Sequence, residues 1–171
     1  MSDIPVISVV AKSGSGKTCL LEKLIKELKN RGLKVAVVKH DVHGFEIDHP
    51  GKDSWRHAQA GADIVSISSP QKFALIEKRS TELTLEQIEK RITGVDIILT
   101  EGYKKGNKPK IEVFRSKVHR DLLCGPEELI ALASDIPCNL GVTCYNIDDA
   151  GGIAQEIILY IKRWKANPKS V

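Results

Sequence analysis

The stretch AKSGSGKT at residues 11–18 constrains the fold more than any other feature of the chain. It follows a run of Ile and Val at 4–10, which is typical of a strand buried on both faces. An amphipathic segment at 17–31 follows it, with apolar residues at helical spacing. A second apolar run, KVAVVKH at 34–40, completes a strand–helix–strand unit. The two strands of such a unit are expected to be parallel.

The glycine-rich loop predicts a site for a nucleoside triphosphate. Backbone N–H groups can converge on phosphate oxygens only where glycine allows close approach and a positive φ, and Gly14 and Gly16 supply that freedom. Lys17 is expected to reach the β- and γ-phosphates, and Thr18 to place its hydroxyl on Mg²⁺. The usual pattern begins with glycine, where this chain has Ala11, the smallest available change.

A site of this class needs a further acidic group near the Mg²⁺. The apolar run in VDIILTEGY, residues 95–103, ends at Glu101, whereas Asp96 lies at its beginning. Ligands of open parallel sheets bind at the carboxyl ends of the strands. Glu101 is therefore the expected catalytic and metal-binding carboxylate, although Asp is usual in this role. Asp41 and Asp48 remain alternative Mg²⁺ ligands, because their loop leaves the second strand at the same sheet edge.

The rest of the chain alternates between short strands and helices. Expected strands cover 95–100, 110–115 and 129–134, and an antiparallel hairpin covers 63–68 and 73–78. Expected helices cover 54–60, 84–92 and 149–165, the second opened by a capping box at Thr84 and Gln87. This order predicts one domain, residues 1–171, with an α/β fold. Its P-loop NTPase-like, mostly parallel sheet is flanked by helices and carries an added antiparallel hairpin.

Composition excludes several classes of function. The chain is 42% hydrophobic and 28% charged, as in globular proteins, and it has no apolar run of membrane-spanning length. Its start lacks a secretion signal, so we expect a cytoplasmic protein. The net charge of +4 suits a small anionic ligand better than a nucleic acid. The four cysteines form no C-x-x-C pair and the histidines lack ligand spacing, which disfavours a zinc site.

Three blocks of the sequence resemble one family. They are AKSGSGKT, VKHDVHGFEIDHPGKDSWRHAQAGA at 38–62 and TEGYKKGNKPKIEVFR at 100–115. From residue 4 to about 160 the chain looks like the molybdopterin-guanine dinucleotide biosynthesis protein B family (MobB). The resemblance implies a GTP-binding adapter with weak intrinsic GTPase activity. Such a protein acts with the molybdenum cofactor guanylyltransferase, which attaches GMP to molybdopterin. It also implies a homodimer in which some sheet strands cross between subunits.

The family's motifs are carried over residue by residue. The implied phosphate-binding residues are Ser13, Gly14, Ser15, Gly16, Lys17 and Thr18. The second block supplies Asp48, Gly51, Lys52, Asp53 and Ser54, and the third supplies Glu101, Gly102 and Lys104. The implied cofactors are GTP and Mg²⁺.

Recognition of guanine is less well defined by the residues. The N-K-x-D signature of ordinary GTPases is absent. Asp135 ends an expected strand, so its carboxylate could accept hydrogen bonds from guanine N1 and N2, or it could cap a turn. The preference for GTP over ATP therefore comes from the resemblance.

Two other functions are compatible with the loop: a small-molecule kinase and a metallochaperone GTPase of the nickel-insertion type. A kinase closes an arginine-rich lid over the phosphate, but the loop arginines here are scattered, at Arg56, Arg79, Arg115 and Arg120. This favours slow hydrolysis and an adapter. A metallochaperone would be expected to carry a Cys/His cluster, which the chain lacks.

A lysine-rich loop lies within the third block. Lys104, Lys105, Lys108 and Lys110 fall within seven residues. We expect this loop to gather a second anion, either the phosphate of the pterin precursor or an acidic patch on the partner enzyme. The alternative is a solvated turn, in which solvent screens the lysines from one another.

Overall fold

A computed structural model describes residues 4–41, 43–118, 120–139 and 141–167. Contacts within the chain define two compact units, one from residues 1–40 and 86–171 and the other from residues 41–85. The expectation of a single domain stays a prediction. Among the described residues, no helix has the length and apolar character needed to cross a membrane.

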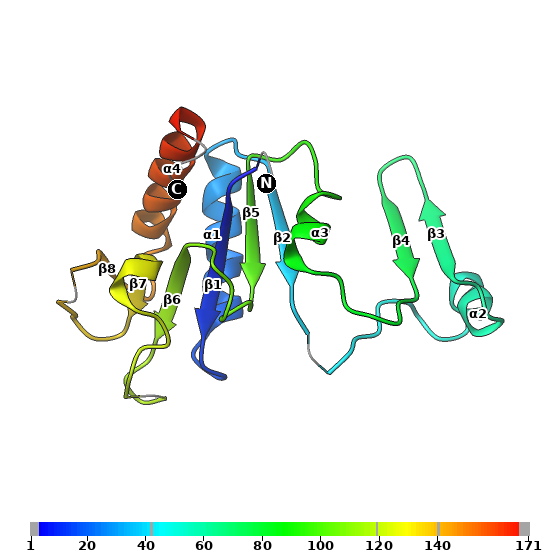
Figure 1. Cartoon of the computed structure of the whole chain (residues 1–171), viewed down its shortest axis with the longest axis horizontal. Helices are drawn as coiled ribbons and strands as arrows, with labels where there is room; N and C mark the ends of the chain where they lie inside the picture. Colours follow the sequence, from blue (N-terminus) through cyan, green and yellow to red (C-terminus); the bar gives the residue numbers. More distant parts are fainter. Residues whose placement is uncertain (1–3, 42, 119, 140, 168–171) are drawn as a thin grey trace. The chain divides into compact units, whose positions relative to one another are not determined.

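A six-stranded sheet forms the centre of the first unit. Its strands are β1 (Val6–Ala11), β2 (Val35–Lys39), β5 (Ile97–Glu101), β6 (Lys110–Phe114), β7 (Leu129–Ser134) and β8 (Cys144–Asn146). They lie in the order β2-β5-β1-β6-β7-β8, and each neighbouring pair is parallel (Figure 1). The predicted α/β fold is confirmed. β1 and β2 are parallel as expected, but β5 lies between them.

The core of the first unit explains why β1 is apolar at every position except Ser8, whose hydroxyl accepts a hydrogen bond from Thr100. Helices α1 (Lys17–Asn30) and α4 (Ala150–Ala166) pack against each other and against the sheet (Figure 1). Ile7 and Val9 belong to this helix-covered core, whereas Val10 packs in a separate cluster with Cys124 and Leu129. Alternate residues of the strand are thus buried in different clusters, so no position favours a polar residue for solvent contact.

Two charged side chains of β6 are buried, and each has partners. Lys110 is 1% exposed, donates a hydrogen bond to the Gly106 carbonyl at 2.7 Å and pairs with Glu128. Glu112 is fully buried and accepts hydrogen bonds from the backbone N–H groups of residues 123 and 124, at 2.8 and 3.1 Å. These contacts offset the cost of burying charge. They also fix the chain that follows β6 against the sheet.

The second unit contains helix α2 (Asp53–Gln59) and the hairpin of β3 (Ile64–Ser68) and β4 (Phe73–Glu77). The predicted antiparallel pairing is confirmed, with Val65 opposite Ile76 and Ser66 opposite Leu75. Val65 is buried on the hairpin face that includes Ile76, and α2 packs on β3.

Three short elements differ from the sequence-based expectation. Helix α3 covers Leu85–Glu89 and ends before Ile92, because residues 91 and 92 donate i→i−3 bonds that tighten the chain into turns. The 3₁₀ helix η1 (Pro126–Glu128) and strand β8 were not predicted. Each contains three residues, which is too short for a periodic pattern to show.

Candidate nucleotide-binding site

The loop 11–18 joins β1 to α1, and two glycines give it its shape. Gly14 and Gly16 have φ angles of 78° and 88°, left-handed values that other residues adopt at a cost. Gly16 is the N-cap residue of α1. As a glycine it has no side chain that could accept a hydrogen bond from the first helical turn. The N–H groups of the first helical turn require acceptors, and phosphate oxygens suit them because the helix dipole is positive there.

Glu101 lies beside this loop, as the sequence predicted. It is the last residue of β5 and pairs in register with Val9 of β1. The hydroxyl of Thr18 donates a hydrogen bond to Glu101 Oε1 at 3.1 Å, and the Lys17 ammonium lies 3.6 Å from the same oxygen. The Glu101 side chain is 12% exposed, so the carboxylate is largely shielded from bulk water. A lysine, a hydroxyl and a carboxylate therefore meet at one point of the sheet edge.

The chain turns sharply after Glu101. Gly102 has a φ of 111°, and a Cβ on it would lie 3.2 Å from Cβ of His40. Tyr103 follows with a φ of 52°, and its ring stacks on the His40 ring at a centroid distance of 4.9 Å. The positive φ and the close approach to His40 thus favour glycine at position 102 of this turn. The structure places Lys104 just beyond the turn, with an exposed side chain.

The lysine-rich loop is less free to gather anions than the sequence suggested. Lys108 Nζ forms an ion pair with Glu89 Oε1 at 2.7 Å, and the Glu89 side chain is only 2% exposed. Lys110 is buried against Glu128. Two lysines of the loop that we expect to gather a second anion are thus paired with carboxylates of this chain. Lys104 and Lys105 remain exposed at the surface.

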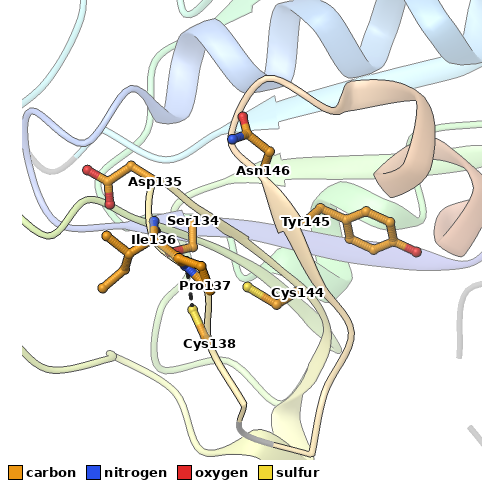
Figure 2. A pocket seen from close by; sticks show the side chains of 8 residues that line it. All are labelled: Ser134, Asp135, Ile136, Pro137, Cys138, Cys144, Tyr145 and Asn146. Carbon is orange, nitrogen blue, oxygen red and sulfur yellow. Dashed lines mark hydrogen bonds between the residues drawn. The ribbon is translucent and has the colours of Figure 1, made fainter.

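Asp135 lies at the carboxyl end of β7, next to a pocket of about 240 Å³ that Figure 2 shows. Its two carboxylate oxygens accept hydrogen bonds from the backbone N–H and the hydroxyl of Ser116, at 2.8 and 3.2 Å. The backbone bond is the main reason why the pKa of Asp135 is lowered. The geometry thus favours the turn-capping role of the two roles considered. Asn146 and the thiols of Cys138 and Cys144 also line the pocket.

The residues of the second block lie together in the second unit, around the start of α2. Asp48 accepts a hydrogen bond from the His49 N–H at 2.8 Å, and its other oxygen is buried without a hydrogen bond among the described residues. Gly51 has a φ of 86°. Lys52 precedes α2, while Asp53 and Ser54 form its first turn. Asp41 is exposed and accepts a hydrogen bond from the His43 N–H at 3.1 Å.

Sequence reasoning missed one residue of this site. It grouped Arg115 with scattered loop arginines, but the Arg115 Nε donates a hydrogen bond to the Ser15 carbonyl at 3.0 Å. Arg115 follows the last residue of β6, and β6 is the parallel neighbour of β1. Its position at the carboxyl end of the 110–115 run was the available signal.

A parallel α/β sheet, a glycine-rich loop leading into α1 and a carboxylate on the adjacent strand define the P-loop class of nucleotide-binding folds. The family model for molybdopterin guanine dinucleotide synthesis protein B, MobB, matches residues 6–135, and the chain belongs to this family. The resemblance drawn from the three sequence blocks is thereby confirmed.

Individual relatives agree with this assignment. The chain is 38% identical to the molybdopterin-guanine dinucleotide biosynthesis adapter protein of Escherichia coli K12, over 94% of this chain and 95% of that protein. It is 33% identical to the adapter protein of the same name from Haemophilus influenzae, over 95% and 90%. A crystal structure of molybdopterin-guanine biosynthesis protein B is similar at a TM-score of 0.72 and 32% identity, over 92% of this chain and 99% of that one.

Proposed function

We propose that the chain is an adapter in the biosynthesis of molybdopterin guanine dinucleotide, and that it binds GTP with Mg²⁺ on the loop 11–18. The observation that carries the proposal is the meeting of Lys17, Thr18 and Glu101 at the start of α1. Family membership supports the biosynthetic role. The names of the relatives support the adapter role.

The side chains at this point fit a magnesium ion. Mg²⁺ prefers hard oxygen ligands and is usually held by one or two carboxylates together with substrate phosphates and water. The Thr18 hydroxyl and the Glu101 carboxylate supply such oxygens 3.1 Å apart. The described residues contain no group of three or more His, Cys, Asp or Glu side chains placed to hold a metal. The oxygens of Thr18 and Glu101 therefore suit an ion that completes its coordination with phosphate and water. When bound, Mg²⁺ would neutralise part of the phosphate charge.

The chain's own groups then have distinct roles. The loop N–H groups donate hydrogen bonds to the phosphate oxygens. Lys17 neutralises the charge of the terminal phosphates, so its ammonium leaves Glu101 to contact phosphate. Thr18 and Glu101 would hold the ion through their side-chain oxygens. Gly102 keeps the turn after β5 close to His40, which maintains the position of Glu101. Asp48, Gly51, Lys52, Asp53 and Ser54 lie together in the second unit, and we assign them to nucleotide binding through the family resemblance.

We propose that the isolated chain hydrolyses GTP slowly at most. A kinase would need an arginine-rich lid. A nickel metallochaperone would need a soft-metal cluster, and none occurs among the described side chains. The adapter role therefore accounts for the site better than the kinase or the metallochaperone.

Two surfaces are candidates for partners. Lys104 and Lys105 are exposed beyond the turn that follows Glu101. We propose that they bind an anionic group of molybdopterin or of the guanylyltransferase. The second unit exposes Ile64, Phe73 and Leu75 on its hairpin, and we assign this face to a second copy of the chain.

The test is a titration with a fluorescent GTP analogue. Lys17→Ala should weaken binding by about 30-fold, because a charge-assisted bond of about 2 kcal/mol is lost. Lys26→Ala is the matched control, because Lys26 is an exposed lysine of the same helix. Equal affinity of the Lys17 variant and the wild-type protein would exclude the loop as the site.

The adapter role needs a separate test. Formation of the guanine dinucleotide by the guanylyltransferase is measured with and without the chain, and Lys17→Ala should reduce any stimulation. A guanylyltransferase that works equally well alone would contradict the adapter role without affecting the nucleotide site.

A further inference from the structure

Arg115 is placed beside the loop by the order of the strands. It follows Phe114, the last residue of β6. β6 pairs in parallel with β1, with Ala11 opposite Val113, so both strands end at the same edge of the sheet. Arg115 therefore leaves the sheet next to the loop that begins at Ala11, although the two are about a hundred residues apart in sequence.

The side chain of Arg115 makes a directed contact with the loop backbone. Its Nε–H donates a hydrogen bond to the Ser15 carbonyl at 3.0 Å, and Ser15 is 1% exposed. A Cβ placed on Gly16 would lie 3.5 Å from Nη2 of Arg115 and 3.6 Å from its Nε. The guanidinium thus lies against Gly16 at van der Waals distance.

This contact fixes the orientation of one peptide group. The carbonyl of Ser15 and the N–H of Gly16 belong to the same planar unit, and in a trans peptide they point in opposite directions. Holding the carbonyl toward Arg115 turns the Gly16 N–H to the side of the loop away from Arg115. A cationic donor on the carbonyl also polarises the peptide, which makes the opposite N–H a stronger donor.

Two carboxylates interact electrostatically with the Arg115 guanidinium. Asp135 and Asp148 lie within its electrostatic reach. The pKa of Asp135 is lowered mainly by the Ser116 N–H and that of Asp148 mainly by Lys23, and the charge of Arg115 lowers both further. Arg115 thus contacts the loop backbone and lies within electrostatic reach of two carboxylates that follow β7 and β8.

We propose that Arg115 is a positioning residue for the nucleotide phosphates: it holds the Ser15–Gly16 peptide so that the Gly16 N–H faces them. The inference rests on the proposed nucleotide site. A lysine could supply the charge, but it lacks the planar fork that contacts the carbonyl and Gly16 together. The contact acts on the shape of the loop, so it should matter for GDP as well as for GTP.

The experiment compares Arg115→Ala, Arg115→Lys and the control Arg163→Ala, which removes an exposed arginine of α4. Affinities for fluorescent GDP and GTP analogues are measured with Mg²⁺. Arg115→Ala should weaken both by about tenfold, the loss of one charge-assisted bond. Arg115→Lys should recover part of this affinity. Guanidinium ion, at a concentration too low to unfold the protein, should partly restore binding to Arg115→Ala and should not restore it to Lys17→Ala.

The outcomes separate this inference from the proposed function. If Lys17→Ala loses affinity and Arg115→Ala does not, Arg115 has no positioning role and the nucleotide site stands. If neither loses affinity, both proposals fail. If the affinity of Arg115→Ala falls together with its thermal stability, and neither guanidinium nor lysine restores it, the residue has a general structural role and the inference is overturned. Partial rescue by guanidinium supports the inference even if the variant is less stable.

Discussion

At the scale of single residues, Glu101 has the most consequential position. Its carboxylate contacts both functional side chains at the start of α1, the Thr18 hydroxyl and the Lys17 ammonium. These contacts hold the two side chains in place before a ligand arrives. A preformed arrangement lowers the entropy cost of ordering these side chains on binding.

Glu101→Gln should reduce the Mg²⁺ dependence of GTP binding more than binding itself. The amide keeps the shape and the contact with Thr18, but it loses the charge that attracts the ion. We expect the gain in affinity on adding Mg²⁺ to shrink by about tenfold, measured with a fluorescent GTP analogue across a Mg²⁺ titration. Asp96→Asn, at the opposite end of β5, is the control. An unchanged Mg²⁺ response would direct attention to Asp41 and Asp48.

Cys124 should make stability depend on pH in the alkaline range. Burial, followed by the nearby Glu112 and Glu128, raises the pKa of its thiol to about 11. The folded state therefore keeps its proton at pH values where the unfolded chain loses it. The contribution of the protonated thiol to the free energy of unfolding is complete below pH 9 and is lost as the pH rises toward 11.

Urea denaturation between pH 9 and 11 tests this expectation. The free energy of unfolding of the wild-type protein should fall more steeply than that of Cys124→Ala, by up to about 1 kcal/mol per pH unit. Cys19→Ala removes an exposed thiol and should follow the wild-type slope. Parallel slopes for wild type and Cys124→Ala would show that the thiol titrates normally in the folded state.

At the scale of secondary-structure elements, the apolar runs predicted where the strands lie in the sequence. They predicted less well which strands are neighbours in the sheet. Buried strands were identifiable because both faces are covered, and Glu101 followed from the rule that ligands lie at carboxyl ends of strands. The insertion of β5 between β1 and β2 left no local trace in the sequence. Neither did the pairing of β6 with β1, which brings Arg115 to the loop. Long-range pairing depends on the whole sheet, so motifs alone could not reveal that contact.

The ion pair between Lys108 and Glu89 is a second feature that only the assembled elements show. It joins the loop before β6 to the end of α3, and Glu89 is 2% exposed. Lys108→Ala would leave a buried carboxylate without its cation. We expect a loss of roughly 1–3 kcal/mol in the free energy of unfolding.

Glu89→Gln combined with Lys108→Met should recover most of that loss, because no unpaired charge stays buried. Lys105→Ala, on the same loop but exposed, should be close to neutral. Chemical denaturation of the four proteins gives the comparison. If the single Lys108 variant is as stable as wild type, the ion pair contributes little and Lys108 becomes available again for an external anion.

At the scale of the whole molecule, the second unit buries few apolar side chains: among its described residues these are Val65 and Leu85. One face of its hairpin carries the buried Val65, but the other face exposes Ile64 by 56%, Phe73 by 66% and Leu75 by 49%. A two-stranded hairpin is marginally stable alone in water, and large exposed apolar side chains gathered on one face mark a contact surface. The family resemblance implies a homodimer with strands that cross between subunits, and this face has the chemistry for such a contact.

Leu75→Glu should therefore shift the chain toward monomers. The new carboxylate would have to be buried without a partner when two copies meet, so the dimer dissociation constant should rise on the order of 100-fold or more. Sedimentation equilibrium over a range of protein concentrations measures this shift. Thr81→Glu adds the same charge at an exposed position of the same unit and should leave dimerisation unchanged. Circular dichroism establishes that both variants stay folded. A wild-type protein that is monomeric at every concentration, or a Leu75→Glu variant that dimerises like Thr81→Glu, would show that the hairpin face serves another partner.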